Sequence, residues 1–119
     1  MIKRQLSNAR MSQIVSYNAT VYLAGQVAKD PSQDMADQTR QILAQIDSLL
    51  EQAGTDKSRL LSANIWVSDI REFQSMNEIW DAWVDKQNPP VRACVEARLA
   101  RPELRVEIQV VAAHCAAVR

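Results

Sequence analysis

The chain lacks a net charge, a cysteine framework and a long apolar run, and each absence excludes a class of function. Its 14 basic side chains balance its 14 acidic ones, so electrostatics give no reason to expect a nucleic-acid or anionic-membrane partner. The longest apolar run, residues 110–118, is interrupted by His114 and is far too short to cross a bilayer. The first residues carry basic groups without the apolar segment of a signal peptide. We therefore expect a cytoplasmic protein with no membrane partner.

The two cysteines, Cys94 and Cys115, form no Cys-x-x-Cys pair. A chain of 119 residues is long enough to bury a core without disulfides, and such cysteine usage suits a reducing cytoplasm. The same length, with no internal repeat, low-complexity segment or linker, predicts a single domain over residues 1–119.

Two segments have the apolar spacing of amphipathic helices. Ser32 or Asp34 can cap the first helix, and Gly54 is suited to the position just after its end. Asp69, with Glu72 three residues on, resembles a capping box for the second, which we expect to end at the Asn88-Pro89-Pro90 segment. The expected inner faces are Met35, Thr39, Ile42, Ile46, Leu49, Leu50 and Ala53 on the first helix, and Phe73, Met76, Trp80, Trp83 and Val84 on the second.

Strands are expected before and between these helices. Short strands are predicted near residues 2–6 and 13–17, and a stronger one over residues 20–27, which is rich in β-forming residues. Residues 58–68 predict a further strand. Its expected inner face is Leu61, Ala63, Ile65 and Val67.

Two strands near the C-terminus alternate apolar and polar residues with a period of two, which gives each strand two chemically different faces. The first covers residues 90–99 and the second residues 105–110. The polar positions are Arg92, Cys94, Glu96 and Arg98 on the first strand, and Arg105, Glu107 and Gln109 on the second. These strands therefore hold charged groups on a rigid frame.

Two helices cover only one face of such an α+β sheet. The other face is expected to carry Leu60, Trp66 and Tyr22 with Asn64, Gln26 and the charged residues of the last two strands. It is too apolar to be left in water and too charged for the core of a monomer. We therefore expect it to contact other copies of the chain, with any ligand site between subunits.

Arg92 and Glu107 are the leading candidate site residues. A guanidinium on a strand offers a planar fork for a carboxylate, and the structural alternative is an intersubunit ion pair with Glu96 or Glu107. A carboxylate such as Glu107 can orient a water molecule or transfer a proton; the alternative is pairing with Arg98 or Arg105.

Other reactive side chains give weaker signals. Cys94 has no general base near it in sequence, so a buried thiol is favoured over a nucleophile. His114 and Cys115 are adjacent and would point to opposite faces of a strand, which argues against a shared metal site. Asn77 is either a surface residue or an amide directed at a ligand. The three tryptophans, Trp66, Trp80 and Trp83, are interpreted as core or interface residues.

Taken together, these segments resemble the RidA/YjgF family of reactive-intermediate deaminases, and within it the YoaB-like branch. The resemblance rests on joint order and spacing over nearly the whole chain. The segments that carry it are Tyr22–Val27 with its Gly-Gln pair, Gln38-Thr39 with 42–54, the second-helix residues Phe73, Met76, Asn77 and Trp80, Pro90–Val95, which resembles the family's Pro-Ala-Arg-x-x-Val signature, and Val106-Glu107-Ile108.

The resemblance implies a chorismate-mutase-like α+β subunit, with two helices on one face of a mixed sheet, assembled as a homotrimer with clefts between neighbours. It implies hydrolysis of 2-imino or enamine acids to 2-keto acids and ammonia, with no cofactor and no metal. Arg92 would bind the substrate carboxylate and Glu107 would activate water. Gly25, Asn77 and Cys94 would line the cleft.

The chain departs from the family pattern at two positions. Met11 occupies the place where many deaminating members have Tyr, and Ala24 replaces the Ser that often precedes the Gly-Gln pair. A second hypothesis is therefore a non-catalytic trimer that binds small keto or imino acids in a regulatory role. A third is a purely structural interaction module.

Overall fold

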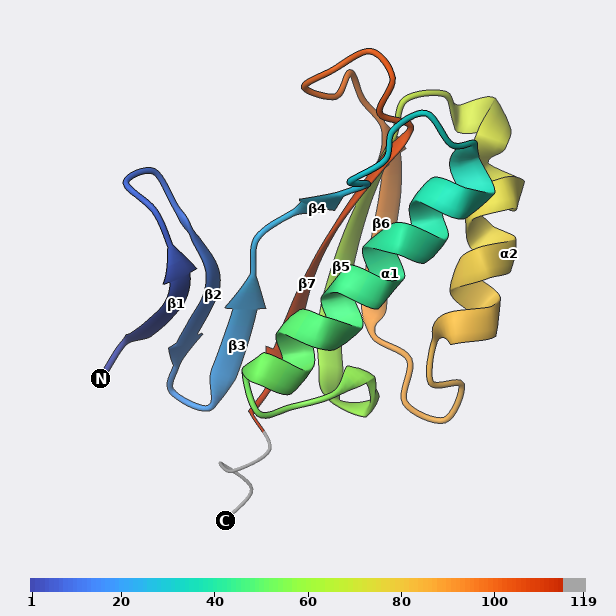
Figure 1. The fold of residues 1–119 in the computed structure, drawn as a ribbon. Helices are drawn as coiled ribbons and strands as arrows, with labels where there is room; N and C mark the ends of the chain where they lie inside the picture. Colours follow the sequence, from blue (N-terminus) through green and yellow to red (C-terminus); the bar gives the residue numbers. More distant parts are fainter. Residues whose placement is uncertain (115–119) are drawn as a thin grey trace.

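The computed structural model describes residues 1–114, which form one mixed β-sheet with two helices on one side (Figure 1). The strands are β1 (Lys3–Ser7), β2 (Ser12–Tyr17), β3 (Thr20–Leu23), β4 (Gln26–Val27), β5 (Leu60–Val67), β6 (Val91–Glu96) and β7 (Val106–Ala113). The helices are α1 (Met35–Gln52) and α2 (Phe73–Trp83). Two short 3-10 turns also occur: η1 (Lys57–Arg59) precedes β5, and η2 (Ile70–Glu72) precedes α2. This is the α+β arrangement predicted from the sequence.

The sheet order is β1-β2-β3-β7-β5-β6, and β4 also pairs with β7. Only β5 and β6 run parallel among the described pairs, because α2 connects them as a crossover. β7 therefore lies at the centre of the sheet and β6 at one edge. The core lies between the sheet and the helices, and its fully buried side chains include Ile14, Ile42, Ile46, Leu50, Val67 and Ile108.

α1 begins and ends as its sequence predicts. The Asp34 carboxylate caps the helix by accepting a hydrogen bond from the Asp37 amide at 2.9 Å. Gly54, just after the helix, has a φ of +82°, a left-handed conformation that glycine adopts without a Cβ penalty. The apolar face expected for this helix is buried against the sheet, so the prediction for α1 is confirmed.

The strand predicted over residues 20–27 is wrong in one respect, because it is two strands. β3 ends at Leu23 and β4 begins at Gln26, with Ala24 and Gly25 outside both. β3 pairs with the C-terminal half of β7 and β4 with its N-terminal half. The chain therefore bends at Ala24-Gly25 while staying beside one partner strand.

The inner face predicted for residues 58–68 is wrong at its first position. Leu60 is 6% exposed and Leu61 is 48% exposed, the reverse of the expectation. A register shift between Leu60 and Ser62 in the pairing with β7 has the effect of a β-bulge, because one extra residue reverses the alternation of side chains. From Ala63 onward the predicted face holds.

The start and end of the second helix also differ from expectation. The Asp69 carboxylate caps η2 by accepting from the Arg71 amide, whereas Glu72 pairs with Arg105 at 3.0 Å and does not complete a capping box. α2 ends at Trp83, several residues before Pro89. The predicted inner face is confirmed, since Met76 and Trp80 are buried and Phe73, Trp83 and Val84 pack against the core.

The C-terminal strands show which set of alternating residues lies under the helices. On β7 the apolar set, Val106, Ile108 and Val110, is buried, so Glu107 projects from the uncovered face. On β6 the opposite holds: Val91 is 73% and Val95 51% exposed, while Cys94 packs against the core. The prediction that Arg92 shares the uncovered face with Glu107 is therefore wrong.

Burial and contacts settle the expectations for four other residues of the uncovered face. Tyr22 is 46% exposed and Asn64 is exposed, as predicted. The prediction for Gln26 is wrong, because this side chain is 8% exposed and contacts Gln45 of α1. The prediction for Leu60 is also wrong, because the register shift after it turns its side chain towards the core. Among residues 1–114 no helix is long and apolar enough to cross a membrane.

Candidate functional site

Arg92 lies on the edge strand β6 and is held against α2. Its Nη1 donates a hydrogen bond to Asn77 Oδ1 at 2.7 Å. Its guanidinium carbon lies 5.3 Å from the centre of the Trp80 ring and 5.9 Å from that of Phe73, within the range of cation–π attraction. The side chain is nevertheless exposed, so it is both fixed and accessible.

The sequence spacing explains this contact. Phe73, Asn77 and Trp80 are four and three residues apart, so they share one face of α2. The parallel crossover from β5 through α2 to β6 lays that face beside β6. A guanidinium has five N–H donors, and the hydrogen bond to Asn77 uses one of them. The remaining donors can form a bidentate pair with a carboxylate.

Cys94 lies two residues after Arg92 and shares its face of β6. Burial is the larger influence on this thiol and raises its pKa above the usual value, while the positive charge of Arg92 acts in the opposite direction. The side chain is partly buried and packs against the core. A neutral thiol of this kind fits a wall of a site rather than a nucleophile.

Glu107 forms a second group of candidates with Gly25. A Cβ placed on Gly25 would lie 2.3 Å from Glu107 Oε2, closer than non-bonded atoms approach. The carboxylate lies directly against the Gly25 backbone, so a side chain at this position would displace the flexible end of Glu107 from where it lies. Glu107 is partly buried, and within residues 1–114 it forms no ion pair.

A glutamine network supports the bend that brings Gly25 to Glu107. Gln26 Nε2 donates to Gln13 Oε1 at 2.9 Å and to the Ala24 carbonyl at 3.1 Å. Gln45 Nε2 of α1 donates to Gln26 Oε1 at 3.1 Å, and the Ala24 amide donates to the Gln13 carbonyl at 2.9 Å. The buried amide of Gln26 thus ties β2, the bend and α1 together.

These two groups lie on opposite faces of the sheet. The Arg92 group (Arg92, Asn77, Cys94, Phe73 and Trp80) is on the helix side of β6, and the Glu107 group (Glu107 and Gly25) is on the uncovered side of β7. β5 separates the two strands. One small ligand cannot contact both groups of the same chain.

Two of the residues considered as ion-pair partners for Arg92 and Glu107 have other partners within the chain. Arg105 pairs with Glu72 at 3.0 Å, and Glu96 Oε2 accepts a hydrogen bond from the Ile70 amide at 3.2 Å. Within the part of one chain that the structure describes, Arg92 forms no salt bridge. An ion pair between copies remains the structural alternative for this side chain.

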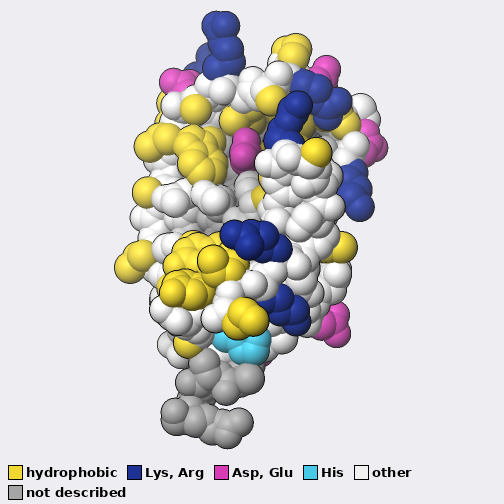
Figure 2. Space-filling model, turned by 90° about the vertical axis from the view of Figure 1, so that its left-hand side faces the viewer, with side chains coloured by type: hydrophobic (Ala, Val, Ile, Leu, Met, Phe, Trp, Pro, Cys, Tyr) yellow, Lys and Arg dark blue, Asp and Glu magenta, His cyan; other side chains and the backbone are white. Residues whose placement is uncertain are grey.

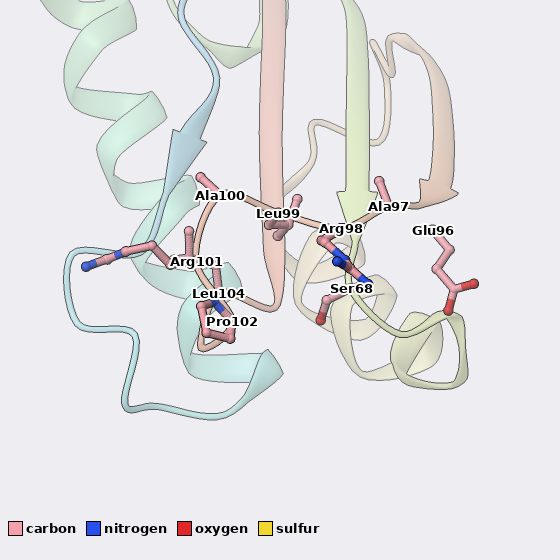
Figure 3. Close-up of a pocket in the computed structure, with 9 residues that line it drawn as sticks. All are labelled: Ser68, Glu96, Ala97, Arg98, Leu99, Ala100, Arg101, Pro102 and Leu104. Carbon is pink, nitrogen blue, oxygen red and sulfur yellow. The ribbon is translucent and has the colours of Figure 1, made fainter.

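A cavity of about 690 Å³ lies where the loop after β6 returns towards β7 (Figure 3). Its lining includes Ser68, Arg98 and Leu104 but none of the candidate site residues. In Figure 3 the Arg98 side chain extends beside Ser68, at the ends of β5 and β6. This cavity is thus separate from both groups.

The other candidates take structural places. Trp80 is 5% exposed, Trp83 donates its indole N–H to Asp47 at 3.0 Å, and Trp66 is partly buried on the uncovered face. Among residues 1–114 there is no group of three or more His, Cys, Asp or Glu side chains suited to a metal. The expectation for His114 with Cys115 cannot be followed, since Cys115 lies outside the described residues.

Two sets of contacts were not predicted. Phe73 was expected on the inner face of the second helix and Trp80 as a core or interface residue, with no contact to Arg92. Their spacing with Asn77 is visible in the sequence, but the face of β6 that they contact is not. Gln13 and Gln45 gave no signal, because their amides become partners of Gln26 only through the bend at Gly25.

Comparison with known proteins places this geometry among close relatives. A family model described as Endoribonuclease L-PSP matches residues 1–114. The chain is 44% identical over 107 residues to the RutC family protein YoaB of Escherichia coli, covering 90% of this chain and 93% of that protein. It is 30% identical over 125 residues to the human 2-iminobutanoate/2-iminopropanoate deaminase, covering 94% and 90%.

A solved structure supports the same relationship. The crystal structure of a YjgF-family member from Neisseria meningitidis superposes with a TM-score of 0.93 at 43% identity, covering 96% of this chain and 95% of that one.

Proposed function

The chain belongs to the RidA/YjgF family, whose model is described as Endoribonuclease L-PSP, and from this premise we propose that it hydrolyses 2-imino or enamine acids to 2-keto acids and ammonia. The human relative that bears the name of such a deaminase motivates the reaction. The proposed enzyme is a 2-iminobutanoate/2-iminopropanoate deaminase-like hydrolase that acts in the cytoplasm on small carboxylates.

The proposed assembly is a homotrimer in which each site forms between two copies. One copy supplies the Arg92 group and its neighbour supplies the Glu107 group, because the sheet separates the two within a chain. The uncovered face offers apolar surface for such contacts, with Val91, Val95 and Tyr22 between 46% and 73% exposed. Seen from the side of β1, hydrophobic side chains also gather in patches between Lys and Arg side chains (Figure 2).

Arg92 is the proposed carboxylate anchor. Its free N–H donors would bind the two carboxylate oxygens of the imino acid in a bidentate, charge-assisted pair. Asn77 already accepts one guanidinium N–H, so its amide N–H group is available to the ligand. Exclusion of water by the neighbouring copy would strengthen the pair, because charges attract more strongly at lower dielectric.

Glu107 is the proposed general base. Its carboxylate would accept a proton from water as the water oxygen attacks the imine carbon, and would pass that proton to nitrogen to give a carbinolamine. Glu107 would then carry the hydroxyl proton to nitrogen while the C–N bond breaks and the carbonyl forms, which releases ammonia. One imine and one water thus give one keto acid and one ammonia. Imines already hydrolyse in water, so holding the reactants together supplies much of the acceleration.

The observation that carries this proposal is the exposed yet fixed guanidinium of Arg92, in a family where a relative is named as an imine deaminase. The test generates 2-iminopropanoate with an amino-acid oxidase and traps it with semicarbazide. We expect the wild-type protein to suppress semicarbazone formation and the Arg92→Ala variant, confirmed to assemble normally, not to do so. Equal semicarbazone formation with wild-type protein and with buffer would reject the deaminase.

Met11 and Ala24 favour a second candidate, a non-catalytic trimer that binds keto or imino acids. Ala24 supplies no hydroxyl beside Gly25, and Met11, 41% exposed, lies two residues before Gln13, whose carbonyl bonds the Ala24 amide. Binding of 2-oxobutanoate by calorimetry without accelerated imine loss would support this candidate. The absence of any ligand-induced stabilisation would count against it.

A further inference from the structure

We propose that α2 controls ligand affinity by positioning the Arg92 guanidinium, with Phe73 and Trp80 acting as a two-ring support and Asn77 as the hydrogen-bond acceptor that sets its rotation. The carboxylate ligand in this inference is that of the proposed function. The positioning itself is a property of the free chain and is testable without any ligand.

An arginine on an exposed edge strand is normally mobile. Its long side chain populates many rotamers, and ordering it on ligand binding costs conformational entropy. Here the guanidinium carbon lies 5.3 Å from Trp80 and 5.9 Å from Phe73, and Nη1 is bonded to Asn77 at 2.7 Å. Three contacts from one helix face therefore order the side chain before a ligand arrives.

The support is itself rigid because it is anchored in the core. Trp80 is 5% exposed, and Met76 on the same helix is fully buried. The Trp80 ring also packs against Trp83, with ring centres 5.3 Å apart. The position of the guanidinium is thus set by the packing of α2 on the sheet.

Ring contacts and the Asn77 bond leave the outward donors of Arg92 free. Removal of a ring would therefore release the arginine without removing the donors. Since the carboxylate is bound both before and during hydrolysis, loss of positioning should raise KM and leave kcat nearly unchanged. A ring that served only the fold would not produce this split.

The experiment compares matched variants of the full chain. Trp80→Phe keeps an aromatic face and Trp80→Leu removes it, while Phe73→Leu does the same at a less buried position should Trp80→Leu fail to fold. Binding of 2-oxobutanoate is measured by calorimetry in each variant, and again with Arg92→Ala added. Circular dichroism and size-exclusion chromatography check the fold and assembly of each protein.

We expect Trp80→Leu or Phe73→Leu to weaken binding by about three- to tenfold, the loss of a cation–π contact, and Trp80→Phe to stay within about twofold. In the Arg92→Ala background the leucine variants should cause no further loss, because their effect passes through Arg92. An equal further loss in that background, or unchanged affinity in the single variants, would overturn the proposal.

Side-chain NMR separates this inference from the proposed function. In the ligand-free protein, nitrogen-15 spectra of the Arg92 guanidinium should show restricted motion in the wild type and in Trp80→Phe, and released motion in Asn77→Ala combined with Phe73→Leu. A rigid Arg92 in a protein that binds no keto acid would uphold the positioning and reject the carboxylate site. A mobile Arg92 in the free wild type would reject the positioning even if the ligand binds.

Discussion

The Arg92 group and the Glu107 group hold a charged side chain by opposite means. Arg92 is held by what surrounds it, since two rings and an amide of α2 attract its guanidinium. The position of Glu107 depends on free space, since its carboxylate occupies the volume that a side chain on Gly25 would fill. The attractive contacts of Arg92 can be weakened one at a time, whereas a single added side chain at Gly25 would fill the space beside Glu107. The two groups should therefore respond differently to substitution.

The largest expected effect is on the Glu107 side. Glu107→Gln keeps the size of the side chain and removes the base, so we expect imine turnover to fall by about 10²- to 10⁴-fold, the usual contribution of general acid–base catalysis. Binding of 2-oxobutanoate should remain close to wild type. The semicarbazide assay measures turnover, and calorimetry measures 2-oxobutanoate binding, on the same protein sample. A variant that retains turnover would remove Glu107 from the chemistry.

Gly25→Ala tests the free space beside Glu107. The new Cβ would meet Glu107 Oε2 at 2.3 Å and force the carboxylate away, so we expect kcat to fall by about ten- to hundredfold, as for a misplacement near 1 Å. Circular dichroism and size-exclusion chromatography are the controls, because they show whether the variant folds and assembles as the wild type does. Equal kinetics for Gly25→Ala and wild type would show that Glu107 does not act from this position.

Arg92→Lys asks whether the Arg92 group works by charge or by its fork. Lysine keeps the positive charge but cannot form the planar bidentate pair, so we expect carboxylate affinity to fall about tenfold, one charge-assisted hydrogen bond. Arg92→Ala should lose at least as much. Calorimetric titration with 2-oxobutanoate gives both values. If Lys equals Arg, the fork and its α2 contacts are irrelevant to binding.

Mixing two inactive variants tests whether the groups come from different copies. Chains carrying Arg92→Ala and chains carrying Glu107→Gln are unfolded together in equal amounts and refolded. Random assembly should restore about a quarter of wild-type turnover, because an intact site needs one particular variant on each side. Each variant refolded alone is the control. No recovery in the mixture, with normal assembly, would mean that the two groups do not share a site.

The smallest expected effect concerns Cys94, which borders the Arg92 group. Burial raises the pKa of this thiol, and Arg92 partly offsets the rise. As pH increases, the thiolate should appear later than in a free cysteine, so iodoacetamide should label Cys94 a few-fold more slowly near pH 8. Arg92→Ala should slow labelling further. A Cys115→Ser background leaves Cys94 as the cysteine that is labelled. A labelling rate equal to that of free cysteine would contradict the raised pKa.

Sequence patterns located the two helices and the principal candidates, because apolar spacing reports which residues share a face. They did not report which face the helices cover. On β6 the covered set contains Arg92 and Cys94, so an argument from charge alone placed Arg92 on the wrong side. The bulge at Leu60 and the break at Gly25 were missed because each inserts or removes one step of the alternation, and pairing with β7 decides both. The contacts between α2 and Arg92 could not be predicted without knowing which face of β6 the helices cover.

The β-sheet that separates Arg92 from Glu107 also bears on enzyme concentration. A single folded chain would contain both groups and still lack a complete site, so newly made subunits would be inactive until they assemble. Specific activity of the proposed enzyme should then decline as the protein is diluted below the dissociation constant of its assembly, and recover on reconcentration. An enzyme whose two groups met within one chain would keep the same specific activity at every dilution.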